Sequence, residues 1–368
     1  MTEAESFDLI RLAKDKLTDR MVILGHHYQR DEIIQFADYS GDSLELSQIA
    51  ARQKEVEYIV FCGVHFMAES ADILTTDKQK VLLPDLTAGC SMADMAEIDQ
   101  VEWCWQYLQE HVRAGRKIVP ISYVNSSAAI KAFCGRNDGI CCTSSNCRRI
   151  FESVWDEYPK AVILFLPDQH LGRNTAYEMG VKLNQMALWN PFEEGGGLGV
   201  DQIKASQMIL WDGFCSVHQE FKAEHIDKAR AEIPGLKVIV HPECCFEVAQ
   251  RADDVGSTAY IIKAVRASER GSRWVVGTET NLVHRLAEEM AEKDVVVRSL
   301  SQCACQCETM YRIDPKHLAW LLDMLGKHVE EPEKVKLMNQ ITVPEEVKKY
   351  ARVALQKMLE VTSANAGK

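Results

Sequence analysis

One pattern of strands and loops occurs three times along the chain, and this repetition limits the fold more than any other feature. Short β-branched runs alternate with helical stretches, which is typical of βα units around parallel sheets. Four strands are predicted in each repeat, and three of them can be given residue bounds. These strands cover residues 21–24, 58–62 and 81–83; 117–122, 161–166 and 208–210; and 237–240, 274–276 and 295–297.

The loops after matching strands carry matching side chains. The opening strand leads to GHHYQ (25–29), YVNSS (123–127) and HPECC (241–245). A turn with a small hydroxyl side chain, here called the hydroxyl turn, comes next: GDS (41–43), TSSN (143–146) and GST (256–258). The separation is 17 residues from His26 to Ser43, 19 from Asn125 to Ser144 and 16 from His241 to Ser257. Such regular spacing indicates three copies of one architecture.

A cysteine follows the last strand of each repeat, at Cys90, Cys215 and Cys307. Ligands of open α/β sheets bind beyond the carboxyl ends of the strands, so each cysteine is expected on the functional edge of its own domain. Three domains that face each other would bring the three thiols to one point. We therefore predict an α/β protein of three similar domains, each a small parallel sheet flanked by helices in three layers, with pseudo-threefold symmetry around a central site.

The predicted boundaries follow from the same pattern. Residues 1–100, 101–225 and 226–327 form the three repeats, and residues 328–368 form a charged helical tail that packs on the outside. The second repeat is longer because of an insertion around NPFEEGGGLG (190–199).

Charge and composition exclude several classes of protein. A net charge of −12, from 42 basic and 54 acidic residues, leaves no basic stripe for nucleic acid. No apolar run approaches the roughly 18 residues of a membrane span, and MTEAESFDLI lacks the basic start of a secretory signal. We therefore expect a cytoplasmic chain, and its thirteen cysteines do not indicate a disulfide framework.

The three repeated cysteines favour a metal cofactor. A structural zinc site usually takes four ligands in local pairs, whereas a [4Fe-4S] cluster held by three thiolates keeps one iron open. An open iron is a Lewis acid that can polarise a substrate oxygen. The spacing of CACQC (303–307) does not suit a radical-generating loop, and the repeated CxxC runs of ferredoxins are absent from the sequence.

At this point the chain resembles the quinolinate synthase family over nearly its whole length. The motifs that carry the resemblance include GHHYQ, GDSL (41–44), FMAES (66–70), PDLTAGCSMADM (84–95), SYVNSSAAIKA (122–132), CTSSN (142–146), LPDQHLG (166–172), CSVHQEF (215–221), HPEC (241–244), GSTAYI (256–261), GTETNL (277–282) and CETM (307–310). The resemblance implies condensation of iminoaspartate with dihydroxyacetone phosphate to quinolinate, with release of phosphate and water, in NAD biosynthesis. It also implies one [4Fe-4S] cluster per chain and a functional link to the enzyme that supplies iminoaspartate.

The resemblance also implies roles for single residues. Cys90, Cys215 and Cys307 match the cluster ligands, and Glu243 matches the acid/base residue, with Tyr123 as its companion. The residues that match carboxylate-binding and phosphate-binding positions are His26, Tyr28, Ser43, Asn125, Ser144, His218, His241, Ser257 and Thr258.

Plainer interpretations exist for several of these motifs. HPE is more often a turn before a helix, His26 and His27 could cap a helix, and GDSL could be only a helix start. Cys303 and Cys305 are either a spare or redox-sensitive pair or residues that merely fill the loop. Cys244 is expected beside the site and is not expected to bind the cluster. A hydro-lyase of another substrate and an iron–sulfur or zinc sensor are the alternative functions.

Overall fold

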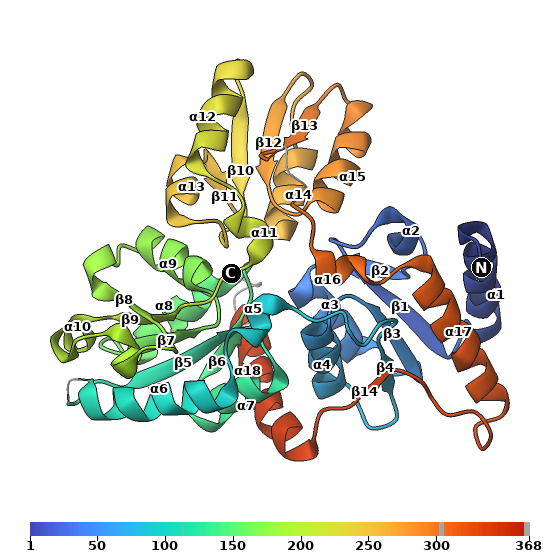
Figure 1. Cartoon of the computed structure of the whole chain (residues 1–368), viewed down its shortest axis with the longest axis horizontal. Helices are drawn as coiled ribbons and strands as arrows, with labels where there is room; N and C mark the ends of the chain where they lie inside the picture. Colours follow the sequence, from blue (N-terminus) through green and yellow to red (C-terminus); the bar gives the residue numbers. More distant parts are fainter. Residues whose placement is uncertain (113, 302–304, 364–368) are drawn as a thin grey trace. The chain divides into compact units, whose positions relative to one another are not determined.

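The computed structural model describes residues 1–112, 114–301 and 305–363. Strands and helices alternate along most of the chain. Figure 1 shows them coloured in sequence order, from blue at the N-terminus to red at the C-terminus. In the first hundred residues the elements are α1 (Glu3–Leu17), β1 (Met21–His26), α2 (Asp31–Ile34), β2 (Tyr39–Gly41), α3 (Ser43–Arg52), β3 (Tyr58–Cys62), α4 (His65–Leu74), β4 (Lys80–Leu82), α5 (Ser91–Asp94) and α6 (Ile98–His111).

The next two segments continue the alternation. The second contains β5 (Ile118–Tyr123), α7 (Ala128–Arg136), β6 (Ile140–Cys142), α8 (Cys147–Glu157), β7 (Val162–Leu166), α9 (Gln169–Glu178), η1 (Leu183–Gln185), β8 (Met186–Trp189), η2 (Glu194–Gly197), α10 (Val200–Ala205), β9 (Met208–Trp211) and α11 (Ser216–Gln219). The third contains α12 (Ala223–Glu232), β10 (Lys237–Val240), α13 (Phe246–Arg251), β11 (Asp254–Val255), α14 (Thr258–Arg266), β12 (Arg273–Gly277), α15 (Thr280–Ala291) and β13 (Val296–Ser299). The elements α16 (Glu308–Tyr311), α17 (Pro315–Glu330), β14 (Gln340–Ile341) and α18 (Glu345–Ser363) complete the described chain.

The three sheets share one strand order, which confirms the predicted α/β fold of three mainly parallel sheets flanked by helices. The orders are β2-β1-β3-β4, β6-β5-β7-β9 and β11-β10-β12-β13, and all these neighbours pair in parallel. The predicted fourth strand of each repeat is the short edge strand β2, β6 or β11. A hydroxyl turn follows each of these edge strands.

Buried apolar runs explain the central strands. Every residue of β1, β3, β5 and β7 is buried, because helices cover both faces of a parallel sheet and leave no polar alternation. Two further strands were not predicted from the sequence. Strand β8 extends the second sheet in parallel beside β9, and β14 joins the first sheet antiparallel to β4. The predicted helical tail therefore includes a strand as well as α18.

The described chain divides into two compact units. The first comprises residues 1–90, 279–285 and 306–344, and the second comprises residues 91–278, 286–305 and 345–368. The first sheet belongs to the first unit, and the other two sheets belong to the second. The division into three repeats and a tail remains a prediction based on the sequence.

Helix α18 is anchored within the second unit. Its Ala351, Ala354, Leu355 and Met358 are buried, and it packs against α7. Gly135 of α7 allows this close approach, because a Cβ there would overlap the carbonyl oxygen of Tyr350. None of the helices in the described residues combines the length and the apolar character that a membrane crossing requires.

Candidate active site

A buried carboxylate between two imidazoles is the most distinctive feature of the second unit. Glu243 Oε2 lies 2.9 Å from Nδ1 of His218 and 3.0 Å from Nδ1 of His241. The two imidazole rings stack, with centroids 4.5 Å apart and planes 20° apart. All three side chains are at most 4% exposed. The structure thus brings together three residues that the sequence proposed for one site.

The neighbouring groups in this cluster shift the pKa values of Glu243 and His218. Burial acts to raise the pKa of Glu243, but the adjacent His241 and His218 outweigh it and hold the pKa well below its usual range. Burial and the neighbouring His241 lower the pKa of His218 against the attraction of Glu243. The carboxylate is therefore ionised at neutral pH, with the His218 ring neutral beside it. The hydroxyl of Thr278 lies 3.3 Å from Nε2 of His218 and orients the ring.

Asp168 is a second buried carboxyl group near Glu243. It begins α9, where its Oδ1 accepts a 2.6 Å hydrogen bond from the backbone N–H of Leu171. Burial and the charge of Glu243 raise its pKa well above the usual range. Two carboxyl groups whose pKa values move in opposite directions are typical of acid/base sites. The sequence analysis did not single out Asp168, although LPDQHLG contains it.

Asn174, also on α9, holds the loop that carries Glu243. Its Nδ2 donates hydrogen bonds of 2.8 Å to the carbonyl oxygens of both Pro242 and Cys244, the residues on either side of Glu243. Asn174 is 3% exposed, so both bonds are shielded from water. The position of Glu243 therefore depends on a helix about seventy residues earlier in the chain.

The other predicted residues of the second unit lie at the carboxyl ends of their strands. Tyr123 ends β5 and is buried, and Asn125 lies two residues further along the same loop. Ser144 follows β6 in the hydroxyl turn. Ser257 is the N-cap of α14 and accepts from the N–H of Tyr260, and Thr258 is the first helical residue. These residues share the edge expected for a ligand.

The first unit has its own group of predicted residues, at the end of β1. The rings of His26 and Tyr28 meet edge to face with centroids 4.7 Å apart, and the backbone N–H of Tyr28 donates to His26 Nδ1. Ser43 is the first residue of α3. Asp42 is the N-cap of that helix and accepts from the N–H groups of Leu44 and Glu45. The helix-start interpretation of GDSL therefore applies to Asp42.

A polar network that the sequence analysis did not assign supports the loop after β1. Asn281 Nδ2 donates to the carbonyl oxygen of Tyr28, and Arg285 Nη1 donates to that of Gln29. Glu279 in turn accepts from the backbone and the side chain of Asn281. Burial raises the pKa of Glu279 to about 7, although backbone N–H groups oppose the shift. Only the motif GTETNL, without roles for its members, pointed to this network.

The three predicted cluster ligands share a local structure. Cys90, Cys215 and Cys307 each directly precede a four-residue helix, namely α5, α11 and α16. They are half-buried, whereas the other described cysteines, apart from Cys245, are buried. Cys90 and Cys307 belong to the first unit and Cys215 to the second. Each of the three thiols therefore lies, partly exposed, after the last of the four equivalent strands of its sheet.

Two other cysteine predictions have different outcomes. Cys244 is fully buried, and its Sγ lies 3.7 Å from the carbonyl oxygen of Gly277, which fits a residue beside the site. Cys305 is buried as well. Cys303 lies outside the described residues, so the question of a redox-sensitive pair with Cys305 stays a prediction.

Cys215 also belongs to a local group of metal-binding side chains. One ligand atom each from Cys215, His218 and Glu243 lies within 4.8 Å of the other two. A thiolate, an imidazole and a carboxylate are all ligands of borderline-soft divalent cations. The carboxyl edge of the second unit can therefore hold a cation with its own residues.

Several buried polar atoms at the strand ends have no hydrogen-bond partner among the described residues. They belong to Gln29 after β1, Asn125 after β5, Thr143 after β6, Asp168 after β7, Glu243 after β10 and Thr280 after β12. Buried polar groups are normally satisfied, so exceptions require an explanation. Their position on the functional edge of each sheet indicates polar ligands. Both Nε2 and Oε1 of Gln29 are without a partner among the described residues. No role had been predicted for Gln29 from the sequence.

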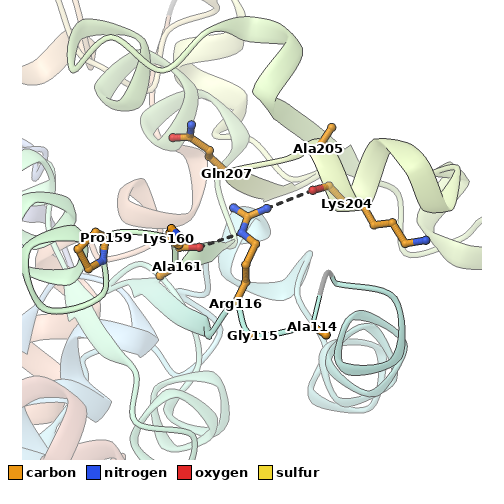
Figure 2. Close-up of a pocket in the computed structure, with 9 residues that line it drawn as sticks. All are labelled: Ala114, Gly115, Arg116, Pro159, Lys160, Ala161, Lys204, Ala205 and Gln207. Carbon is orange, nitrogen blue, oxygen red and sulfur yellow. Dashed lines mark hydrogen bonds between the residues drawn. The ribbon is translucent and has the colours of Figure 1, made fainter.

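A cavity of about 590 Å³ lies at the opposite edge of the second sheet (Figure 2). Arg116, Ala161 and Gln207 line it shortly before β5, β7 and β9 begin. The Arg116 guanidinium is engaged by the carbonyl oxygens of Lys160 and Lys204, at 2.8 and 3.2 Å. Ligands of open α/β sheets bind at the carboxyl edge, so the size of this cavity does not identify the active site.

Comparisons with known proteins show the family to which the chain belongs. The family described as "Quinolinate synthetase A protein" matches residues 9–360. The quinolinate synthase of Acidobacterium capsulatum is 51% identical over 352 residues, which cover 96% of this chain and 92% of the relative. Those of Halalkalibacterium halodurans and Geobacillus sp. strain WCH70 are 52% and 53% identical, over 98% and 95% of this chain and 94% and 92% of the relatives. The chain therefore belongs to the quinolinate synthetase A family.

Proposed function

We propose that the protein is a quinolinate synthase, a transferase that condenses iminoaspartate with dihydroxyacetone phosphate to quinolinate and releases phosphate and water. The reaction serves de novo NAD biosynthesis in the cytoplasm, and an enzyme that supplies iminoaspartate is its functional partner. Family membership over nearly the whole chain supports the reaction. The observation that carries the chemistry is the buried Glu243 between His218 and His241.

Glu243 acts as the base. The reaction removes a proton from a carbon next to a carbonyl group, and the ionised carboxylate of Glu243 is shielded from water. Nδ1 of His218 and Nδ1 of His241 share Oε2, which leaves Oε1 without a partner among the described residues. Oε1 is therefore the atom that takes the substrate proton. Tyr123, buried at the end of β5, is its proposed companion in proton transfer.

Asp168 is the proposed general acid near Glu243. Burial and the charge of Glu243 raise its pKa and so favour its protonated form, and its Oδ2 has no partner among the described residues. A neutral acid near an ionised carboxylate avoids two adjacent buried negative charges. Asp168 therefore stabilises the ionised form of Glu243 and can return a proton when water leaves the product.

Cys90, Cys215 and Cys307 would hold one [4Fe-4S] cluster. When bound, the cluster supplies an open iron that acts as a Lewis acid on a substrate oxygen. The half-buried positions of the three thiols after equivalent strands support this ligand set.

The hydroxyl and imidazole groups at the strand ends bind the anionic substrates. The proposed binding residues are His26, Tyr28, Ser43, Asn125, Ser144, His218, His241, Ser257 and Thr258. Hydroxyl side chains at helix starts can donate to carboxylate or phosphate oxygens together with backbone N–H groups. The unpartnered Oδ1 of Asn125 supports a ligand at the end of β5, because a buried amide oxygen normally has a donor.

Anaerobic purification with iron, sulfide and product analysis tests this proposal. The wild type should contain about four irons and four sulfides per chain and should form quinolinate from the two substrates. Substitution of Cys90, Cys215 or Cys307 by Ser should abolish the cluster and the product together. A folded wild type that binds no iron would overturn the cofactor assignment, and a cluster-loaded wild type without quinolinate formation would overturn the reaction.

Cys245 provides the matched control. It is half-buried like the three proposed ligands, but its thiol donates to Gln219 Oε1 at 3.3 Å. Cys245→Ser should retain the cluster and the activity. Iron loss in this variant would show that the ligand set is different.

A further inference from the structure

We infer that the cluster-free chain has a second metal site, in which Cys215, His218 and Glu243 bind one Zn²⁺ ion and so withhold Cys215 from cluster assembly. The competition part of this inference rests on the proposed cluster ligand set. The zinc site itself rests only on residues of the second unit.

The three ligand atoms already lie close together. They are all within 4.8 Å of one another, and His218 Nδ1 and Glu243 Oε2 are 2.9 Å apart. Zinc bonds to nitrogen and oxygen of about 2.0–2.1 Å place tetrahedral neighbours roughly 3.3 Å apart. A small outward shift of these two side chains, with the Cys215 Sγ at about 2.3 Å from the ion, would therefore complete the site.

Burial and charge favour a cation at this point. Glu243 is only 3% exposed, and its Oε1 has no partner among the described residues. A Zn²⁺ ion with a Cys215 thiolate would balance the charge of the buried carboxylate.

Neighbouring groups fix the orientation of the ligands. Thr278 Oγ1 contacts Nε2 of His218, which directs the other ring nitrogen, Nδ1, towards Glu243. Asn174 holds the backbone on both sides of Glu243. Zinc sites usually have such supporting contacts behind their ligands. With three protein ligands, the fourth position stays available for water.

The two metal sites require different parts of the chain. The zinc ligands all belong to the second unit, whereas the proposed cluster also needs Cys90 and Cys307 of the first unit. Both sites need the Sγ atom of Cys215. Zinc can therefore bind before a cluster is built and would then prevent its assembly.

Titration of the reduced, chelator-treated, cluster-free protein with Co²⁺ tests the site directly. One Co²⁺ per chain should bind with tetrahedral visible bands and a thiolate charge-transfer band, and Zn²⁺ should displace it. Cys215→Ser should abolish the charge-transfer band, and His218→Gln and Glu243→Gln should each weaken binding at least tenfold. Cys245→Ser should bind like wild type. A charge-transfer band that survives in Cys215→Ser but is lost in Cys307→Ser would place the cation elsewhere and overturn the inference.

Reconstitution with iron and sulfide then tests the competition. One equivalent of Zn²⁺ should block cluster formation in wild type, but much less in His218→Gln, which retains all three cysteines. Equal inhibition of both proteins would refute competition at this site. If wild type builds no cluster even without zinc, the proposed cofactor fails, while the Co²⁺ titration still decides whether the cation site exists.

Discussion

Single residues at the strand ends combine burial with unusual protonation. The surroundings of Glu243 lower its pKa and favour its ionised form, burial raises the pKa of Asp168 and favours its protonated form, and burial lowers the pKa of His170, on α9, and favours its neutral form. Each state follows from the neighbours of the residue. Their consequences can therefore be measured one residue at a time, by turnover and by the pH dependence of stability.

Glu243→Gln should reduce quinolinate formation by about 10²–10⁴-fold, because a neutral amide cannot accept the substrate proton. The cluster content should stay at the wild-type value, since the variant keeps all three cysteines. Stopped-time product assays on anaerobic protein measure the effect. Glu247→Gln, on the exposed face of α13 four residues later, should be nearly as active as wild type. Full activity of Glu243→Gln would remove this residue from the chemistry.

His170 should make the protein sensitive to acid. Burial and Arg173 lower its pKa from 6.5 to about 4, against the hydrogen bond with Gln219. Between these two values the unfolded chain binds more protons than the folded one, so stability is lost as pH falls from 6.5 towards 4. At about 1.4 kcal/mol per pKa unit, the difference of about 2.5 units limits the loss to roughly 3.5 kcal/mol.

Urea unfolding across this pH range tests the prediction. His170→Gln should show a shallower fall in the free energy of unfolding than wild type. Parallel curves for wild type and His170→Gln would refute the assignment of acid sensitivity to this histidine.

At the scale of elements, the close approach of α7 and α18 stabilises the second unit. Gly135→Ala should lower the free energy of unfolding by roughly 1–3 kcal/mol, because the added methyl group overlaps backbone atoms of Tyr350 that cannot move alone. Gly326→Ala, in the interior of α17, is the matched control. Its Cβ would meet nothing within 4 Å, so better helix propensity should raise stability by up to about 1 kcal/mol. Thermal unfolding distinguishes the two outcomes, and equal effects would contradict the packing argument.

The elements also separate what the sequence could predict from what it could not. The strand 58–62 was placed at its observed bounds because a parallel strand buried on both faces is a continuous apolar run. Strands β8 and β14 lie on sheet edges and are short or mixed in burial, so they lack that pattern. The glycines of the insertion at 190–199 predicted a mobile loop. In the structure Gly195 and Gly196 are buried with positive φ, and a Cβ at Gly196 would collide with Trp189.

The candidate site was predicted only in part for a related reason. Loop position and family motifs identified Glu243, His218 and His241. Asn174 and Asp168 act on that loop across tertiary contacts, and no local pattern marks such partners. Glu279 likewise supports a loop some 250 residues earlier through Asn281.

At the scale of the whole molecule, the proposed cluster ligands are distributed over both compact units. A cofactor that binds the folded chain and not the unfolded one stabilises the folded state by mass action. Anaerobically reconstituted protein should therefore melt at a higher temperature than the cluster-free protein. Removal of the cluster with a chelator should reverse the shift, and Cys307→Ser should show none. Identical melting curves with and without bound cluster would contradict ligands shared between the units.

The order of elements along the chain has a consequence for its synthesis. The edge of β4 is covered only when β14 at Gln340–Ile341 has been made, and α7 meets its partner only when α18 follows. Neither compact unit can therefore complete its packing before the final segment, with β14 and α18, has left the ribosome. Until then the nascent protein presents an open sheet edge and a bare helix face, which are surfaces on which chains aggregate.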